Sequence, residues 1–116
     1  MKVIIAGSRS ITDRKPVWKA IDASGFSITE VVSGNADGVD KLGELWAASE
    51  NIPVKRFLPD WKRLGKKAGI VRNQEMGKYA DALIAVWNGK SLGTAYMIGY
   101  MRKIRKPTFV WKRVCG

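Results

Sequence analysis

The chain has 116 residues, of which 46% are hydrophobic and 27% are charged. This length and composition are typical of a single globular domain, residues 1–116, with one core, and they exclude a disordered chain. No apolar run approaches the roughly 20 residues that cross a bilayer, and the apolar start is too short for a secretory signal. The lone Cys115 can form no internal disulfide. We therefore expect a cytoplasmic protein with no membrane association.

The charge is strongly positive, with 21 Lys and Arg against 10 Asp and Glu, a net charge of +11. Such a surplus attracts nucleic acid, nucleotides or acidic partners, and it also keeps a small protein in solution. Part of the surplus complements the dipole at the end of a predicted helix or lies in the tail. These residues are Arg102, Lys103, Arg105, Lys106, Lys112 and Arg113. With no histidine and one cysteine, the chain has neither the ligands of a zinc site nor a His-based triad. We expect no metal and no cofactor.

Short apolar runs alternate along the chain with segments of helical periodicity. The predicted strands are residues 3–6, 30–33, 53–58, 82–87 and 108–111. The predicted helices are residues 13–23, 37–50, 70–79 and 92–104, with a polar loop over 59–69. Gly25 is a plausible stop for the first helix.

This alternation predicts an α/β fold, a Rossmann-like three-layer sandwich with a five-stranded parallel sheet. The expected strand order is 3-2-1-4-5, which places the topological switch between the first and fourth strands. Ligands of such sheets bind beyond the carboxyl ends of the strands, at the switch. The unusual residues of this chain do follow strands, so four sequence-distant loops should meet at one rim. The candidate ligand-binding residues are Gly7, Ser8, Arg9, Ser33, Gly34, Asn35, Gly38, Asp40, Arg72, Asn73, Met76, Trp87, Gly93 and Thr94.

The loop after the second strand carries the most specific signal. Gly34 and Gly38 permit close approach of the main chain, and the following helix presents free N–H groups to an anion. The loop lacks the Gly-Lys-Ser/Thr ending of a Walker A motif, and its glycines are misplaced for a dinucleotide fingerprint. Asp37 and Asp40 would repel an anion, so they either cap the helix or, in the case of Asp40, accept from a sugar hydroxyl or brace the loop.

Two further loops add polar groups to the predicted rim. Arg72 and Asn73 are expected near a helix start, where an arginine can clamp a phosphate, with Met76 one turn later. The segment from Ser91 to Thr94 is a second helix entry with a glycine and two hydroxyls. Trp87, at a strand end, either stacks on a base or closes the core.

In these residues the chain resembles the SLOG superfamily, and most closely its small single-domain YspA-like members. The matching elements are Gly7-Ser8-Arg9 with Asp13, Ser33-Gly34-x-Ala36-x-Gly38-x-Asp40, Trp61 with Lys66 and Gly69, Arg72-Asn73-Gln74-Glu75-Met76, and Gly93-Thr94-Ala95-x-Met97. The resemblance covers nearly the whole chain. It implies a Rossmann-like fold and a pocket for nucleotide-derived ligands such as ADP-ribose-like molecules. It also implies a role as sensor or processor of such ligands in bacterial conflict and phage systems.

The wider superfamily includes the LOG phosphoribohydrolases and the DNA-processing DprA proteins. The LOG enzymes resemble this chain in an arginine near the third helix, which Arg72 matches. They also have a glutamate in a Gly-Gly-x-Gly-Thr-x-x-Glu motif, and here Met97 stands at that position. A thioether supplies no acid, base or charge stabilisation. The chain is therefore expected to bind rather than to turn over its ligand. The candidate catalytic residues of an enzyme would be Arg72, Asp40 and Glu75.

Three functions follow from the sequence. The first is a module that senses or sequesters a phosphate-containing nucleotide or an ADP-ribose-like ligand. The second is a hydrolase of an N-glycosidic or phosphate bond, and the third is a nucleic-acid-binding protein driven by the net charge. Trp18, Trp46 and Trp111 cannot all be buried in so small a core, and an exposed aromatic would suit a homodimer surface.

Overall fold

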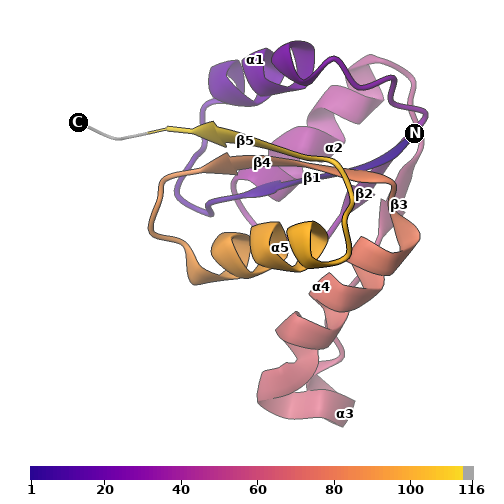
Figure 1. Cartoon of the computed structure of the whole chain (residues 1–116), viewed down its shortest axis with the longest axis vertical. Helices are drawn as coiled ribbons and strands as arrows, with labels where there is room; N and C mark the ends of the chain where they lie inside the picture. Colours follow the sequence, from indigo (N-terminus) through magenta and orange to yellow (C-terminus); the bar gives the residue numbers. More distant parts are fainter. Residues whose placement is uncertain (114–116) are drawn as a thin grey trace.

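The computed structural model describes residues 1–113, so Cys115 lies outside the described residues. Five parallel strands form one sheet between two layers of helices (Figure 1). The strands are β1 (Lys2–Gly7), β2 (Glu30–Ser33), β3 (Val54–Arg56), β4 (Ala82–Trp87) and β5 (Thr108–Lys112). Their spatial order is β3-β2-β1-β4-β5. The predicted α/β class, the parallel sheet and the strand order are confirmed.

The helices cover both faces of the sheet because the buried strand residues point alternately to each face. The helices are α1 (Arg14–Ser24), α2 (Val39–Ser49), α3 (Trp61–Leu64), the 3-10 turn η1 (Gly65–Lys67), α4 (Ala68–Tyr79) and α5 (Leu92–Lys103). Val3 and Ile5 of β1 pack with α1 and α2, whereas Ile4 packs with α4 and α5. Figure 1 shows these two layers on opposite sides of the strands.

Local signals fix most helix ends. The Asp13 side chain accepts a hydrogen bond from the Lys15 N–H at 3.0 Å and starts α1, and Gly25 ends it with φ of +68°. Ser91 caps α5 by accepting from the Thr94 N–H at 3.4 Å. The expected cap at Asp37 is wrong, because Gly38 precedes α2 and makes no side-chain cap bond.

The segment between β3 and α4 differs from the prediction. Strand β3 is shorter than 53–58 because it is an edge strand that pairs only with the four-residue strand β2. Residues 59–69 are not a simple loop: α3 and η1 lie within them, and α4 begins at Ala68 rather than at residue 70. Asp60 nucleates α3 by accepting from the Arg63 N–H at 3.2 Å.

Three of the tryptophans finish the packing of one layer. Trp18, Trp46 and Trp111 are each partly buried against the core beneath α1 and α2. This agrees with the expectation that not all of them can be fully buried. Within residues 1–113, no helix is both long and apolar enough to cross a bilayer.

Candidate functional site

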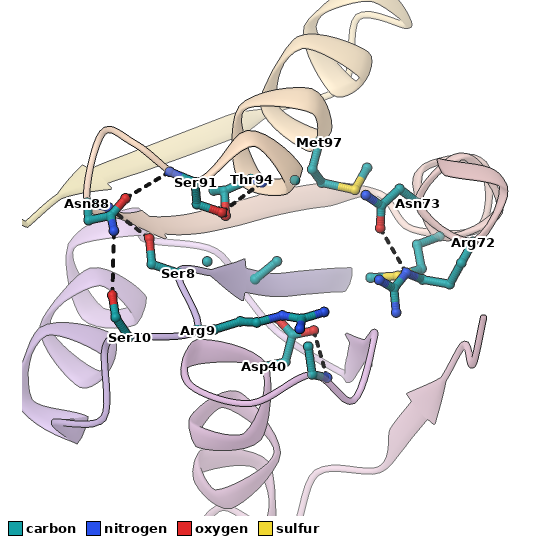
Figure 2. A pocket seen from close by; sticks show the side chains of 15 residues that line it. Ser8, Arg9, Ser10, Asp40, Arg72, Asn73, Asn88, Ser91, Thr94 and Met97 are labelled. Atoms are coloured by element: carbon teal, nitrogen blue, oxygen red, sulfur yellow. Dashed lines mark hydrogen bonds between the residues drawn. The ribbon is translucent and has the colours of Figure 1, made fainter. Parts of the chain in front are cut away.

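A pocket of about 480 Å³ opens beyond the carboxyl ends of β1 and β4, the topological switch of the sheet. Its wall is built by the loop after β1, the loop before α2, helix α4 and the segment from β4 into α5. Figure 2 shows the labelled side chains from these elements around one hollow. The pocket therefore lies where the parallel topology predicts a ligand site.

The main chain forms the base of the pocket, and Ser8 holds its two central strands together. The Ser8 N–H donates to the Val86 carbonyl at 3.1 Å, and the Ser8 hydroxyl accepts from the Asn88 N–H at 3.0 Å. The Ser8 carbonyl accepts from the Val39 N–H at the start of α2, at 3.4 Å. Ser8 is buried, so it acts mainly as a link between β1, the loop after β4 and α2.

Asn88 organises the rim between β4 and α5. Its Oδ1 accepts from the N–H groups of Lys90 at 2.8 Å and Ser91 at 3.0 Å, and its Nδ2 donates to Ser10 Oγ at 3.5 Å. Ser91 Oγ in turn accepts from the Thr94 hydroxyl at 3.1 Å. This side of the pocket is thus a network of hydroxyls and amides without formal charge (Figure 2).

The opposite side of the pocket holds a buried carboxyl. Asp40 lies in the first turn of α2 and is 6% exposed. Its Oδ2 accepts from the Ala36 N–H at 3.2 Å, so it braces the loop before α2. Burial raises the pKa of Asp40 to about 6, against the lowering effects of the Ala36 N–H and the nearby Arg72 guanidinium. This carboxyl titrates close to neutral pH.

Arg72 faces Asp40 from α4. It is half-buried and is the fifth residue of that helix, because α4 begins at Ala68 rather than at residue 70. Its Nη1 donates to the Gly34 carbonyl at 2.8 Å, and its Nε donates to Asn73 Oδ1 at 2.9 Å. Burial lowers the pKa of Arg72, although Asp40 opposes this effect. These two bonds fix the guanidinium and leave Nη2 available to a ligand.

Gly34 is the residue that allows this arrangement. A Cβ at position 34 would lie 2.8 Å from Arg72 Nη1 and 2.9 Å from Asp40 Oδ2. Both distances are too short for van der Waals contact. The arginine and the carboxyl therefore pack against the main chain of the loop after β2 in space that any side chain at residue 34 would fill.

Arg9 brings a second guanidinium to the pocket. It follows β1, and Figure 2 shows its side chain extended toward the hollow above Asp40. Among residues 1–113, no hydrogen bond or ion pair holds its guanidinium. Its charge is close enough to Arg72 to contribute to the lowered pKa of that group. Two cations and one carboxyl thus meet at one side of the pocket.

Nine of the predicted binding residues line the pocket. They are Gly7, Ser8, Arg9, Asp40, Arg72, Asn73, Met76, Gly93 and Thr94. The other five lie outside the lining: Ser33, Gly34, Asn35, Gly38 and Trp87.

Four of these five have clear structural roles nearby. Gly34 accommodates Arg72, and Gly38, with φ of +76°, lies against the Ser8 and Arg9 carbonyls, where a Cβ would be 2.4 and 2.6 Å away. The Ser33 hydroxyl donates to Glu44 at 2.7 Å, and the Trp87 ring N–H donates to the Ser91 carbonyl at 3.1 Å.

The lining also contains six residues outside the list of candidate ligand-binding residues, of which Ser91 is part of a helix entry on the predicted rim. They are Ala6, Ser10, Ala36, Asn88, Ser91 and Met97. Ser10, Ala36, Asn88 and Ser91 belong to the very loops that follow strands, so position alone could have identified them. Met97 is 2% exposed and lies on α5 beside Thr94. Glu75 is exposed and does not line the pocket.

Fold and site together define a Rossmann-like α/β protein with a partly cationic pocket of mixed polar and apolar lining at its switch point. The model of the YspA, cpYpsA-related SLOG family matches residues 1–64. The chain is also 34% identical, over 116 residues, to the Gene 61 protein of Mycobacterium phage D29, covering 91% of this chain and 92% of that protein. The chain belongs to the YspA, cpYpsA-related SLOG family. No solved structure matches it significantly.

Proposed function

We propose that the chain binds a phosphate-containing, nucleotide-derived ligand in the pocket at the switch point. The observation that carries this proposal is the convergence of Arg9 and Arg72, from separate elements, on one pocket. Guanidinium groups are well suited to phosphate because they donate two parallel hydrogen bonds. The pocket volume of about 480 Å³ is within the usual range for small-ligand sites.

The two arginines would have different tasks. Arg72 is fixed by the Gly34 carbonyl and Asn73, so it presents its remaining N–H groups in one orientation. Arg9 is exposed and can close onto a phosphate after it enters. Fixing a donor before binding lowers the entropic cost of recognition, which makes Arg72 the main specificity-determining cation.

Asp40 and the uncharged rim would bind the sugar and base portions. A buried carboxylate oxygen accepts hydrogen bonds from ribose hydroxyls and repels phosphate at short range, so the sugar rather than a phosphate would lie beside Asp40. The hydroxyls of Ser10, Ser91 and Thr94 are both donors and acceptors. A nucleotide or an ADP-ribose-like molecule combines these features in one ligand.

Family membership supports the same ligand class, since SLOG proteins are associated with nucleotide-related ligands. The similarity to a mycobacteriophage protein supports a role in a phage or its host. We propose sensing or sequestration of the ligand in phage–bacterium conflict. Sequestration requires tight binding and no turnover, which fits Met97 at the position where the LOG enzymes have a glutamate.

The test is thermal unfolding of the chain with AMP, ADP and ADP-ribose, followed by calorimetry of whichever binds. At a ligand concentration 100-fold above Kd, we expect a stabilisation of about 2.7 kcal/mol and a rise in Tm of about 10 °C. The variant Arg72→Met should weaken binding about 10- to 100-fold. The matched control Lys103→Met removes an exposed cation outside this pocket and should bind normally. No stabilisation by any of the three compounds would refute the proposal.

A second candidate, hydrolysis of an N-glycosidic bond, has one specific observation in its favour. Asp40 is buried, has a pKa raised to about 6 and lies near Arg72 in the pocket. Carboxyls with such pKa values serve as acids or bases near neutral pH. Incubation with AMP and ADP-ribose, followed by chromatography, would show free base or ribose phosphate. Unchanged compound in a sample that binds it would exclude this activity.

A further inference from the structure

Residues 58–70 form an arm whose side chains belong to neither of the two hydrophobic cores that flank the sheet. This arm, named here the α3 arm, contains α3 and η1 and runs into α4. Figure 1 shows α3 at the far end of α4, beyond the edge of the sheet. Leu58, Trp61 and Ile70 are 65%, 57% and 49% exposed, and none of them belongs to either core. Clusters of exposed large apolar side chains usually mark a binding surface.

The α3 arm is also strongly basic. Lys62, Arg63, Lys66 and Lys67 are all exposed. Asp60 is the only acidic residue between 58 and 70, and it pairs with Arg63 at 3.3 Å. Three lysines of the arm therefore have no acidic partner within residues 1–113. The surface suits a partner that is rich in negative charge.

Trp61 is exposed and lies near the start of α4. A Cβ built on Gly69 would lie 3.8 Å from the ring atom Cη2 of Trp61, so the edge of the indole lies close to the first turn of α4. Its helix is tied down by the Asp60 cap. The ring thus lies beside a capped helix while more than half of its residue surface stays accessible.

We propose that the α3 arm binds single-stranded nucleic acid, with a base stacked on Trp61 and the backbone phosphates on Lys62, Lys66 and Lys67. Aromatic stacking combined with nearby cations is how proteins hold single strands without sequence preference. A second copy of this chain would bring like charges together, since the net charge is +11. An acidic protein segment would satisfy the lysines, but it offers no planar group that requires the indole.

The test is fluorescence anisotropy of a labelled thymidine oligonucleotide of about 12 nucleotides. Three phosphate contacts predict a slope of log affinity against log salt of about −2, which is roughly a 20-fold loss between 50 and 200 mM salt. Trp61→Ala should weaken binding about 5- to 100-fold, and Trp61→Phe should recover part of this loss. Lys66→Ala/Lys67→Ala should reduce the slope by about 1.4.

The control Lys15→Ala/Lys19→Ala removes the same charge from two exposed residues of α1 and should leave binding and slope nearly unchanged. Circular dichroism melting of each variant verifies folding. Four outcomes would overturn the proposal. The first is no binding at low salt, and the second is equal weakening by the α1 control. The third is equal affinity for a duplex of the same length. The fourth is displacement of the oligonucleotide by poly-glutamate of equal charge, together with no effect of Trp61→Ala.

Discussion

The substitution Gly34→Ala separates folding from ligand binding in this structure. Position 34 has no positive φ, so alanine meets no backbone strain there. Its Cβ would lie 2.8 Å from Arg72 Nη1 and 2.9 Å from Asp40 Oδ2. The ends of these two side chains can move more easily than main chain can. We therefore expect a loss of stability of only about 1–2 kcal/mol, a drop in Tm of several degrees.

The same movement displaces the Arg72 guanidinium, on which the proposed binding of phosphate depends. A methyl group on residue 34 would crowd Arg72 Nη1, so the 2.8 Å hydrogen bond from Arg72 to the carbonyl of residue 34 would break. A misplaced charged donor costs about 1.5–3 kcal/mol of binding, which weakens Kd about 10- to 100-fold. Calorimetry with the best of AMP, ADP and ADP-ribose measures this loss, and thermal unfolding measures stability in the same sample.

The control is Gly99→Ala, because a Cβ at that exposed helical position meets nothing within 4 Å. It should bind normally and gain about 0.5–1 kcal/mol of stability. Two results would refute the reasoning. Normal binding by Gly34→Ala would mean that Arg72 does not contact the ligand. A loss above about 4 kcal/mol in stability would mean that the arginine and carboxyl form a rigid part of the fold.

Three further predictions concern stability. Because burial raises the pKa of Asp40 to about 6, the folded state binds the proton of this carboxyl more tightly than the unfolded state does. The free energy of unfolding of the wild-type protein should therefore fall as pH rises from about 4 to 6. Asp40→Asn should remove this dependence, which amounts to at most about 3 kcal/mol in urea titrations. The same change of stability with pH in the variant and the wild type would contradict the raised pKa of Asp40. Gly38→Ala should cost more than 3 kcal/mol because main-chain atoms crowd its Cβ, whereas Gly25→Ala, with a similar φ and open space, should cost about 1 kcal/mol; equal Tm values would count against this contrast. Lys106→Met should cost about 1.5–3 kcal/mol in a thermal melt, because Lys106 Nζ donates to three carbonyls at the end of α4 at 2.7, 3.0 and 2.7 Å, and an unchanged Tm would show that water replaces it.

The sequence was sufficient for most of the fold because the strands are continuous apolar runs. The predicted bounds of β2 and β4 agree with the structure, and the parallel order followed from the alternation with helices. The α3 arm could not be predicted in this way. Its helix is short, and it is stabilised by the Asp60 cap rather than by a periodic apolar stripe.

For the pocket, chain order indicated the right loops but not the task of each side chain. Ser33 was a candidate for ligand binding, yet its hydroxyl donates to Glu44, a residue of α2 that also pairs with Arg56 at 2.8 Å. That pairing depends on how α2 lies over the sheet, which no local pattern records. The support of Arg72 by the Gly34 carbonyl is likewise a contact between residues 38 positions apart.

The close approach of main chain to main chain around the loop after β1 has a consequence for which positions of the chain tolerate substitution. A Cβ at Gly7 would lie 1.9 Å from the Val86 carbonyl, and one at Gly38 would lie 2.4 Å from the Ser8 carbonyl. Neither position therefore tolerates a side chain without a shift of the main chain. Arg9 and Ser10, by contrast, are exposed on the rim and can be exchanged at little cost to folding. Under the proposed function, substitutions at these two positions would change which ligand binds while the fold stays the same.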